Sequence, residues 1–153
     1  MLERYNVEKL VLKSDIIVIG EVVGSGSMWN TPDGKEPMDK SGTYVIYTDS
    51  RIKVEEYLKG KLDDQTITVR MLGGTVGKNT QNVEDQPFYG VGEKVLAFLG
   101  NDPDVRIKDI GDKHFATVGL TQGKISISLN NELVLNEQRM PLEDAEKMIL
   151  SYE

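Results

Sequence analysis

The sequence predicts a mainly β domain, a small barrel of five or six strands with a short helix at each end. Three observations support this class. Several stretches are β-branched or alternate apolar and polar residues, glycines and prolines separate them, and helical spacing occurs only near the two termini. A length of 153 residues and a hydrophobic content of 39% suit one folded domain over 1–153, with no linker or repeat dividing it.

The first part of the chain predicts a helix, a strand and a loop. Apolar residues at helical spacing, Val7, Leu10 and Val11, predict a helix over about 5–14. The β-branched run 16–23 predicts a strand that is buried on both faces. Residues 24–42 contain four glycines and two prolines around the single tryptophan, and they predict a long loop.

Alternating residues then predict two further strands. The pattern over 43–58 indicates a second strand, and its polar centre at 48–50 suggests a bulge or bend. After a turn at 59–61, the alternation over 66–71 predicts a half-exposed third strand.

The centre of the chain combines a loop with three more strands. Residues 73–92 contain five glycines and predict a second long loop. The apolar run 95–99 predicts a fourth strand. Residues 115–120 and 125–129 predict a hairpin, with 121–123 as its turn.

The C-terminal part predicts a short edge strand over 133–135 and an amphipathic helix over about 141–151. Pro141 suits the first turn of a helix, where its missing N–H costs nothing. Glu143 and Asp144 stand where the helix dipole favours negative charge.

Bent, apolar strands of this kind are expected to close on themselves, because an open sheet would expose hazardous edges. The five-stranded OB-type barrel fits the order best, since its first strand is long and buried and its second is long and bent. One feature of the sequence differs from the usual pattern of OB barrels. Many OB barrels carry a helix between the third and fourth strands, and 73–92 has no helical periodicity.

Several segments also resemble a family of uncharacterised prokaryotic domains that are typically exported. The resemblance covers roughly 14–129 and is carried by five pieces of sequence. These are 14–22, Trp29, 54–60, 92–99 and 119–124. The resemblance implies an OB-like fold and an extracytoplasmic location, with a cytoplasmic one as the alternative, but it implies no reaction.

A more distant similarity runs to netrin and TIMP-like modules, which use disulfides. The inhibitors among those modules also chelate the metal of their target with an N-terminal cysteine. This chain contains no cysteine, so inhibition by that mechanism is excluded, as are a disulfide framework and a thiolate zinc site.

Charge and hydropathy exclude further classes. With 25 acidic and 18 basic residues the net charge is −7, which repels phosphate backbones and makes nucleic acid a poor partner. The longest apolar runs are far shorter than the roughly 18 residues of a membrane-spanning helix, so no transmembrane segment is expected.

No motif amounts to a catalytic, cofactor or metal site. The loop at 73–80 resembles a phosphate-binding loop, but Leu72 and Asn79 stand where that motif requires glycine and a hydroxyl residue. His114 is the only histidine and is interpreted as a turn residue. The acidic residues of 102–112 lack the spacing of a calcium loop and are interpreted as a solvated turn. The prediction is a protein that is not an enzyme and has no cofactor.

The two long loops supply the candidate binding residues. Trp29 either folds back as a plug over the barrel mouth or stays exposed for recognition. If the loops approach each other, their glycines and aromatic residues form a groove. The candidate binding residues are Trp29, Asn30, Gly73, Gly74, Gly77, Pro87, Phe88 and Tyr89.

The predicted function is therefore a non-catalytic binding or protein-interaction domain, outside the cytoplasm, with an unknown protein or glycan as partner. One alternative is a single-stranded nucleic-acid-binding OB domain that stacks bases on Tyr44 and Tyr47. A less favoured alternative is a metal-dependent hydrolase that uses the carboxylates of 102–112.

Overall fold

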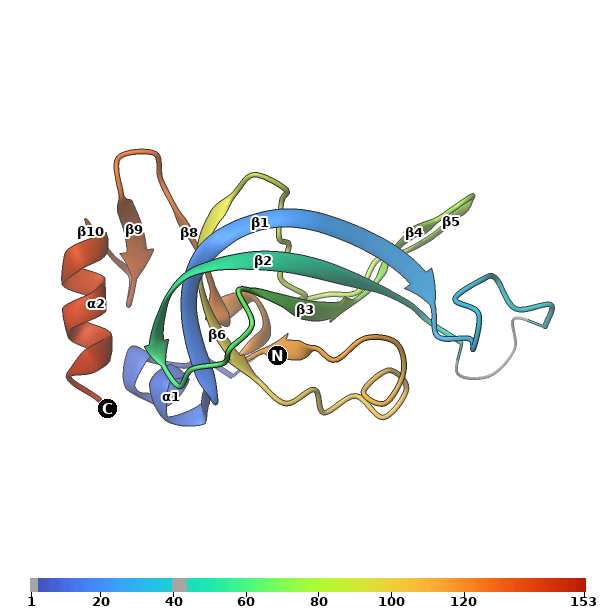
Figure 1. Cartoon of the computed structure of the whole chain (residues 1–153), viewed down its shortest axis with the longest axis horizontal. Coiled ribbons are helices and arrows are strands. Elements are labelled where there is room, and N and C mark those ends of the chain that lie inside the picture. The colour runs from blue at the N-terminus through green and yellow to red at the C-terminus, as the bar shows by residue number, and fades with distance from the viewer. Residues whose placement is uncertain (1–2, 40–43) are drawn as a thin grey trace.

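A computed structural model describes residues 3–39 and 44–153 of the chain. It confirms the predicted class, because strands dominate the structure and a short helix lies near each end (Figure 1). Helix α1 spans Val7–Lys13 and helix α2 spans Leu142–Leu150. Gly42 and Thr43, the predicted end of the first loop and start of the second strand, lie outside the described residues.

The two helices begin for different reasons. Asn6 caps α1, where its side-chain oxygen accepts a hydrogen bond of 2.9 Å from the N–H of Lys9. Pro141 precedes the first turn of α2, which carries Glu143 and Asp144 as the sequence predicted. Both helices bury apolar residues against the outer face of the sheet.

Strands β1 (Ile16–Trp29) and β2 (Ile46–Lys59) form one long antiparallel pair that arches across the whole molecule (Figure 1). The prediction of a loop from residue 24 is therefore wrong up to Trp29. Glycines and serines fill this part of β1, and the pairing with β2 continues to the partners Trp29 and Ile46. The cross-strand ladder holds this stretch extended despite its loop-like composition.

The bulges of this pair lie elsewhere than the sequence predicted. Residues 48–50 pair regularly. The register of the pair shifts instead at Leu58 and Glu55 in β2 and at Val23 in β1, which have no partner on the other strand. The Val23 irregularity matters most, because one extra residue reverses which side chains face inward. Ser25 consequently pairs with Ser50 on the same face as the core residue Ile52.

Five strands form a closed ring of pairings. β2 pairs with β3 (Thr66–Leu72), and β3 pairs in parallel with β7 (Phe115–Thr117). β7 pairs with β6 (Lys94–Gly100), which returns to β1. The ring thus closes in the order β1-β2-β3-β7-β6.

The predicted hairpin between 115–120 and 125–129 is wrong. β7 and β8 (Lys124–Ile127) do not pair with each other but with opposite ends of β6. The short 3₁₀ helix η1 (Leu120–Gly123) occupies the predicted turn and carries the chain along β6 instead of back on itself.

Two small hairpins project from this ring. β4 (Gly74–Val76) pairs with β5 (Asn79–Gln81) inside the segment that was predicted as a loop. As the sequence indicated, no helix stands in this described segment. The predicted strand over 133–135 is β9 (Glu132–Leu135), which pairs with β10 (Gln138–Pro141) beside α2.

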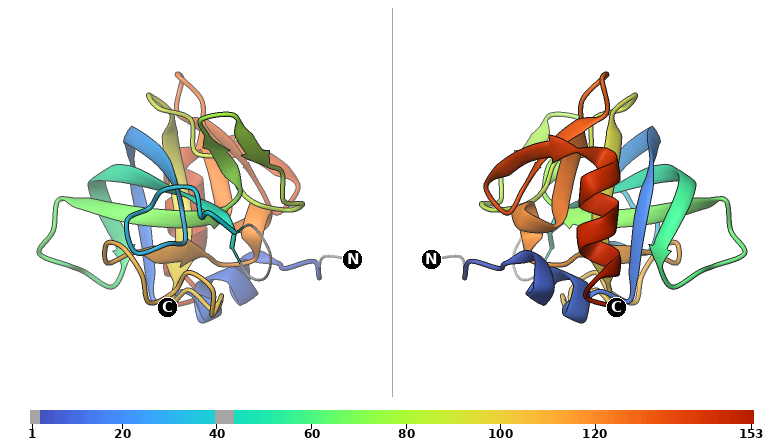
Figure 2. Two further views of the ribbon diagram at one scale, coloured as in Figure 1. Left: turned by 90° about the vertical axis from the view of Figure 1, so that its right-hand side faces the viewer. Right: turned by 90° about the vertical axis from the view of Figure 1, so that its left-hand side faces the viewer.

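Apolar residues gather in two cores, one inside the ring and one outside it. The inner core contains Val22, Ile52, Val69 and Tyr89. The outer core joins Ile17, Ile19 and Phe98 to the helices and to the β9–β10 hairpin, which cover one end of the molecule (Figure 2). None of the helices in the described parts of the chain is long and apolar enough to span a membrane.

Candidate functional site

Two hollows lie side by side at the C-terminal end of β3. They share a wall made by Met71, Leu72, Gln86 and Pro87. We call one of these hollows the mouth hollow, because it continues the inner face of the ring beyond the core. The second, the side pocket, lies between β3, β7 and the segment 101–107.

The mouth hollow has a volume of about 340 Å³ and an uncharged lining. Its hydroxyl groups come from β1 and β2, where Ser25 pairs with Ser50 and Ser27 with Thr48. The segments 73–74, 81–83 and 86–89 close its other sides. The lining residues are Ser25, Ser27, Thr48, Ser50, Met71, Leu72, Gly73, Gly74, Gln81, Asn82, Val83, Gln86, Pro87, Phe88 and Tyr89.

The hydroxyls of this hollow have fixed roles. Thr48 Oγ1 donates to the carbonyl oxygen of Gly73 at 2.8 Å, which uses its only proton. Ser27 Oγ, 2.7 Å from Thr48 Oγ1, must therefore donate to it and keeps its lone pairs free to accept. Gly74 is required here, since its φ is +135° and a Cβ would collide with Thr48 Oγ1.

Two amides have an equally defined orientation. Gln81 Oε1 accepts from the N–H of Ile46 at 2.7 Å, and Gln86 Oε1 accepts from the N–H of Leu72 at 3.0 Å. Since a backbone N–H can only donate, the oxygen of each amide faces it. The two NH₂ groups have no hydrogen-bond partner within the described part of the chain, and neither does the fully buried hydroxyl of Ser50.

The aromatic residues differ in exposure. Tyr89 is buried, its hydroxyl lies 2.8 Å from Thr117 Oγ1, and burial raises its pKa, so the phenol stays neutral. Pro87 is buried beside it. Phe88 is 75% exposed, and its ring lies against Gly90, where a Cβ would come within 3.2 Å of it.

Five predicted binding residues thus meet in the mouth hollow, namely Gly73, Gly74, Pro87, Phe88 and Tyr89. The other three lie elsewhere. Trp29 is only 4% exposed, so it is not an exposed recognition side chain, and its role as a plug over the barrel mouth stays a prediction. Asn30 accepts from the N–H of Val45 and donates to the carbonyl of Arg106, and Gly77 lies at the tip of the β4–β5 hairpin.

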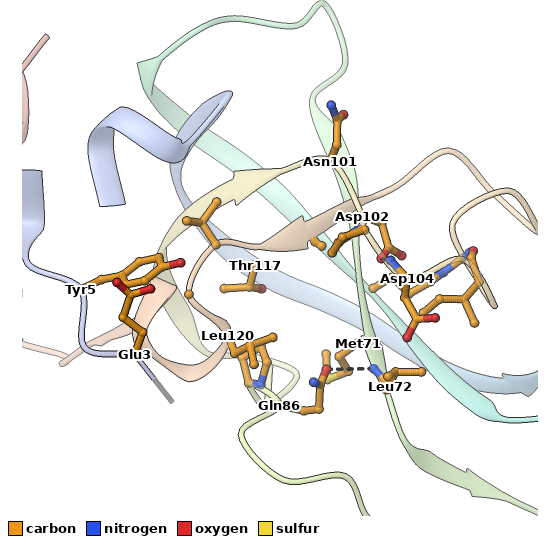
Figure 3. Close-up of a pocket in the computed structure, with 17 residues that line it drawn as sticks. Glu3, Tyr5, Met71, Leu72, Gln86, Asn101, Asp102, Asp104, Thr117 and Leu120 are labelled. Carbon is orange, nitrogen blue, oxygen red and sulfur yellow. Dashed lines mark hydrogen bonds between the residues drawn. The ribbon is translucent and has the colours of Figure 1, made fainter. Parts of the chain in front are cut away.

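The side pocket is larger, at about 430 Å³, and mostly apolar (Figure 3). Glu3 and Tyr5, from the segment before α1, stand on one side, and Asp102 and Asp104 stand opposite (Figure 3). Leu120 contributes an apolar side chain from a backbone with φ of +55°, which is rare for a bulky residue. Met71, Ile107, Ala116 and Val118 are among the other apolar residues of its wall.

Every charged side chain that lines the side pocket already has a partner in the protein. Glu3 bonds to Lys9, and this contact lowers the pKa of its carboxyl. Asp104 makes two hydrogen bonds to the guanidinium of Arg106, which lower its carboxyl pKa. Among the residues that the structure describes, each charged side chain of this lining is therefore already engaged within the protein.

Asp102 is paired with the only histidine. Its Oδ2 lies 2.9 Å from His114 Nε2, and both side chains are buried. His114 Nδ1 lies 2.9 Å from the carbonyl oxygen of Asp112, so both ring nitrogens face acceptors. His114 thus secures the turn in which the sequence placed it.

Arg70 forms the base of the side pocket. It makes a two-pronged contact with Asp49, with distances of 2.7 and 2.9 Å, and donates to the carbonyl oxygens of Ile107 and Ile110 at 2.6 Å. Its guanidinium also stacks 4.1 Å from the ring centre of Tyr47. Tyr47 is therefore buried and does not offer a surface for stacking bases.

No pattern in the sequence indicates the side pocket. Its walls come from segments far apart in the chain, and the sequence placed Asp102, Asp104 and His114 in exposed turns. A comparison with protein-family models and a comparison with curated proteins both find no match for this chain. Among the residues that the structure describes, no group of histidine and carboxylate side chains is arranged to hold a metal ion.

Proposed function

We propose that this chain is a non-catalytic binding domain that receives an uncharged apolar group of a partner protein in its side pocket. The observation that carries this proposal is a mostly apolar cavity of about 430 Å³ whose charged lining residues are all paired internally. A charged ligand would have to compete with these pairs, whereas an aromatic or branched side chain gains from burial alone.

The ring of pairings supports an OB-like barrel as the framework of this domain. Such barrels present binding surfaces on loops that a rigid sheet holds in place. The resemblance to exported prokaryotic domains supports an extracytoplasmic site of action. Cell fractionation of the native organism tests the location, and recovery of the chain only in the cytoplasmic fraction would contradict it.

An uncharged apolar dye tests the pocket directly. Nile red should fluoresce on binding the native chain, and Ala116→Leu, which fills the pocket, should weaken binding roughly tenfold. Ala116→Ser keeps the volume and serves as the control. Equal binding by the leucine variant and the native chain, with equal melting temperatures, would refute this function.

A further inference from the structure

We infer that the mouth hollow is a second binding site, and that its ligand is a neutral saccharide. The inference does not depend on the side pocket, because three of the side chains that carry it, Ser27, Gln81 and Phe88, line the mouth hollow alone, and only Gln86 borders both. Although 28% of the chain is charged, no charged side chain lines this hollow among the residues that the structure describes. Phosphorylated, carboxylated and cationic ligands would find no counter-ion here.

The hydrogen-bonding groups define the ligand further. Gln81 and Gln86 each offer an NH₂ donor, and Ser27 offers acceptor lone pairs. A purely apolar ligand would strip water from these groups and leave each of them without a hydrogen-bond partner, which disfavours its binding. A sugar hydroxyl both donates and accepts, so it can answer donors and acceptors placed side by side.

The exposed ring of Phe88 supplies the other half of saccharide recognition. One face of a pyranose consists of C–H groups, which pack favourably against the negative face of an aromatic ring. Of the two aromatic residues that line the hollow in the described parts of the chain, Phe88 is accessible and Tyr89 is buried. The volume of about 340 Å³ lies within the range of small-ligand sites, roughly 300–1,000 Å³.

Titration with defined oligosaccharides tests the inference. The probes are the neutral hexasaccharides of cellulose, xylan, starch and chitin, with oligogalacturonate as a charged comparison. At least one neutral probe should shift the backbone amide signals of 25–27 and 81–89 with a dissociation constant of about 1 mM or tighter. No shift in these segments at about 10 mM of any neutral probe would overturn the inference, as would preferential binding of oligogalacturonate.

Two substitutions separate recognition from folding. Phe88→Ala should weaken binding roughly tenfold, whereas Val91→Ala, which removes an exposed apolar side chain from the same segment, should not. Gln81→Glu keeps the oxygen that accepts from Ile46 but removes the NH₂ donor, and should also weaken binding. Unchanged affinity in both Phe88→Ala and Gln81→Glu would refute the site even if a probe binds.

Discussion

Arg70 shows how one residue joins distant parts of this molecule. It is fully buried on β3, pairs with Asp49 on β2 and holds the carbonyl oxygens of Ile107 and Ile110. The local sequence does not predict this role. Arg70 occupies an outward position of an alternating strand, where an exposed side chain is expected. Its burial depends on the segment 101–114, which folds over that face and brings its own acceptors.

Removing Arg70 should therefore be costly. In Arg70→Met, Asp49 becomes a buried carboxylate without a counter-ion, and we expect a loss of about 3–5 kcal/mol in urea unfolding. Adding Asp49→Leu should recover part of that loss, since the uncompensated charge disappears. Arg139→Met, at an exposed position, is the control. A loss as small as that of the control would show that the pair contributes little.

Trp29 and Phe88 allow a matched comparison of two aromatic residues. Trp29 is buried at the end of β1, so Trp29→Ala should lower the free energy of unfolding by about 3–5 kcal/mol. Phe88→Ala removes an exposed ring and should cost less than about 0.5 kcal/mol. Differential scanning calorimetry measures both. A nearly unchanged melting temperature in Trp29→Ala would favour recognition over the plug.

At the scale of elements, Glu93 fixes the segment that carries Phe88. Its carboxylate accepts from Lys124 Nζ at 2.7 Å, from the hydroxyl of Ser126 and from the N–H of Gly90 at 3.0 Å. Burial alone would raise its pKa, but these three hydrogen bonds outweigh burial and hold the pKa below its ordinary value of 4.5. The bonds tie the end of this segment to β8.

This shift predicts a pH dependence. Because the carboxyl pKa is lower in the folded state, the stabilisation is complete above pH 4.5 and is lost as the pH falls through the folded-state value. Glu93→Gln should be less stable than the native chain at pH 7, and the difference should shrink below pH 4.5. Urea titrations at several pH values measure it. A difference that does not change with pH would exclude this role for Glu93.

Sequence patterns predict some of the strands and not others. The apolar runs of β1 and β6 and the alternation of β3 identify those strands, because burial imposes these patterns. Residues 24–29 escape prediction, because their glycines and serines resemble a loop and only pairing with β2 makes them a strand. β7 and β8 mimic a hairpin, since the sequence does not show that both join β6.

The same limits explain the site predictions. Glycine and aromatic content identifies the segments of the mouth hollow, but composition cannot show that Trp29 turns inward while Phe88 stays out. Its serines went unnoticed because the irregularity at Val23 sets which way they face. The side pocket depends on contacts between residues more than a hundred positions apart, such as the N–H of Tyr5 and the side chain of Gln122.

For the whole molecule, the ring predicts an uneven distribution of stability. β6 and residues 16–21 of β1 have paired neighbours on both edges, whereas β4–β5 is an isolated two-stranded hairpin. In native-state hydrogen exchange, the amides of β6 and of this part of β1 should open only with global unfolding, and those of β4–β5 should exchange at least about 100-fold faster. Uniform protection across these strands would contradict this distribution.

The two-sided pairing of β1 also has a consequence for synthesis. A ribosome releases β1 and β2 first, and they can pair at once, but the second edge of β1 must wait for β6, some 70 residues later. Until then the apolar run 16–19 presents unpaired backbone to any other chain. The nascent protein is therefore most prone to aggregate between the emergence of these two strands, when a chaperone that covers extended apolar segments would protect it.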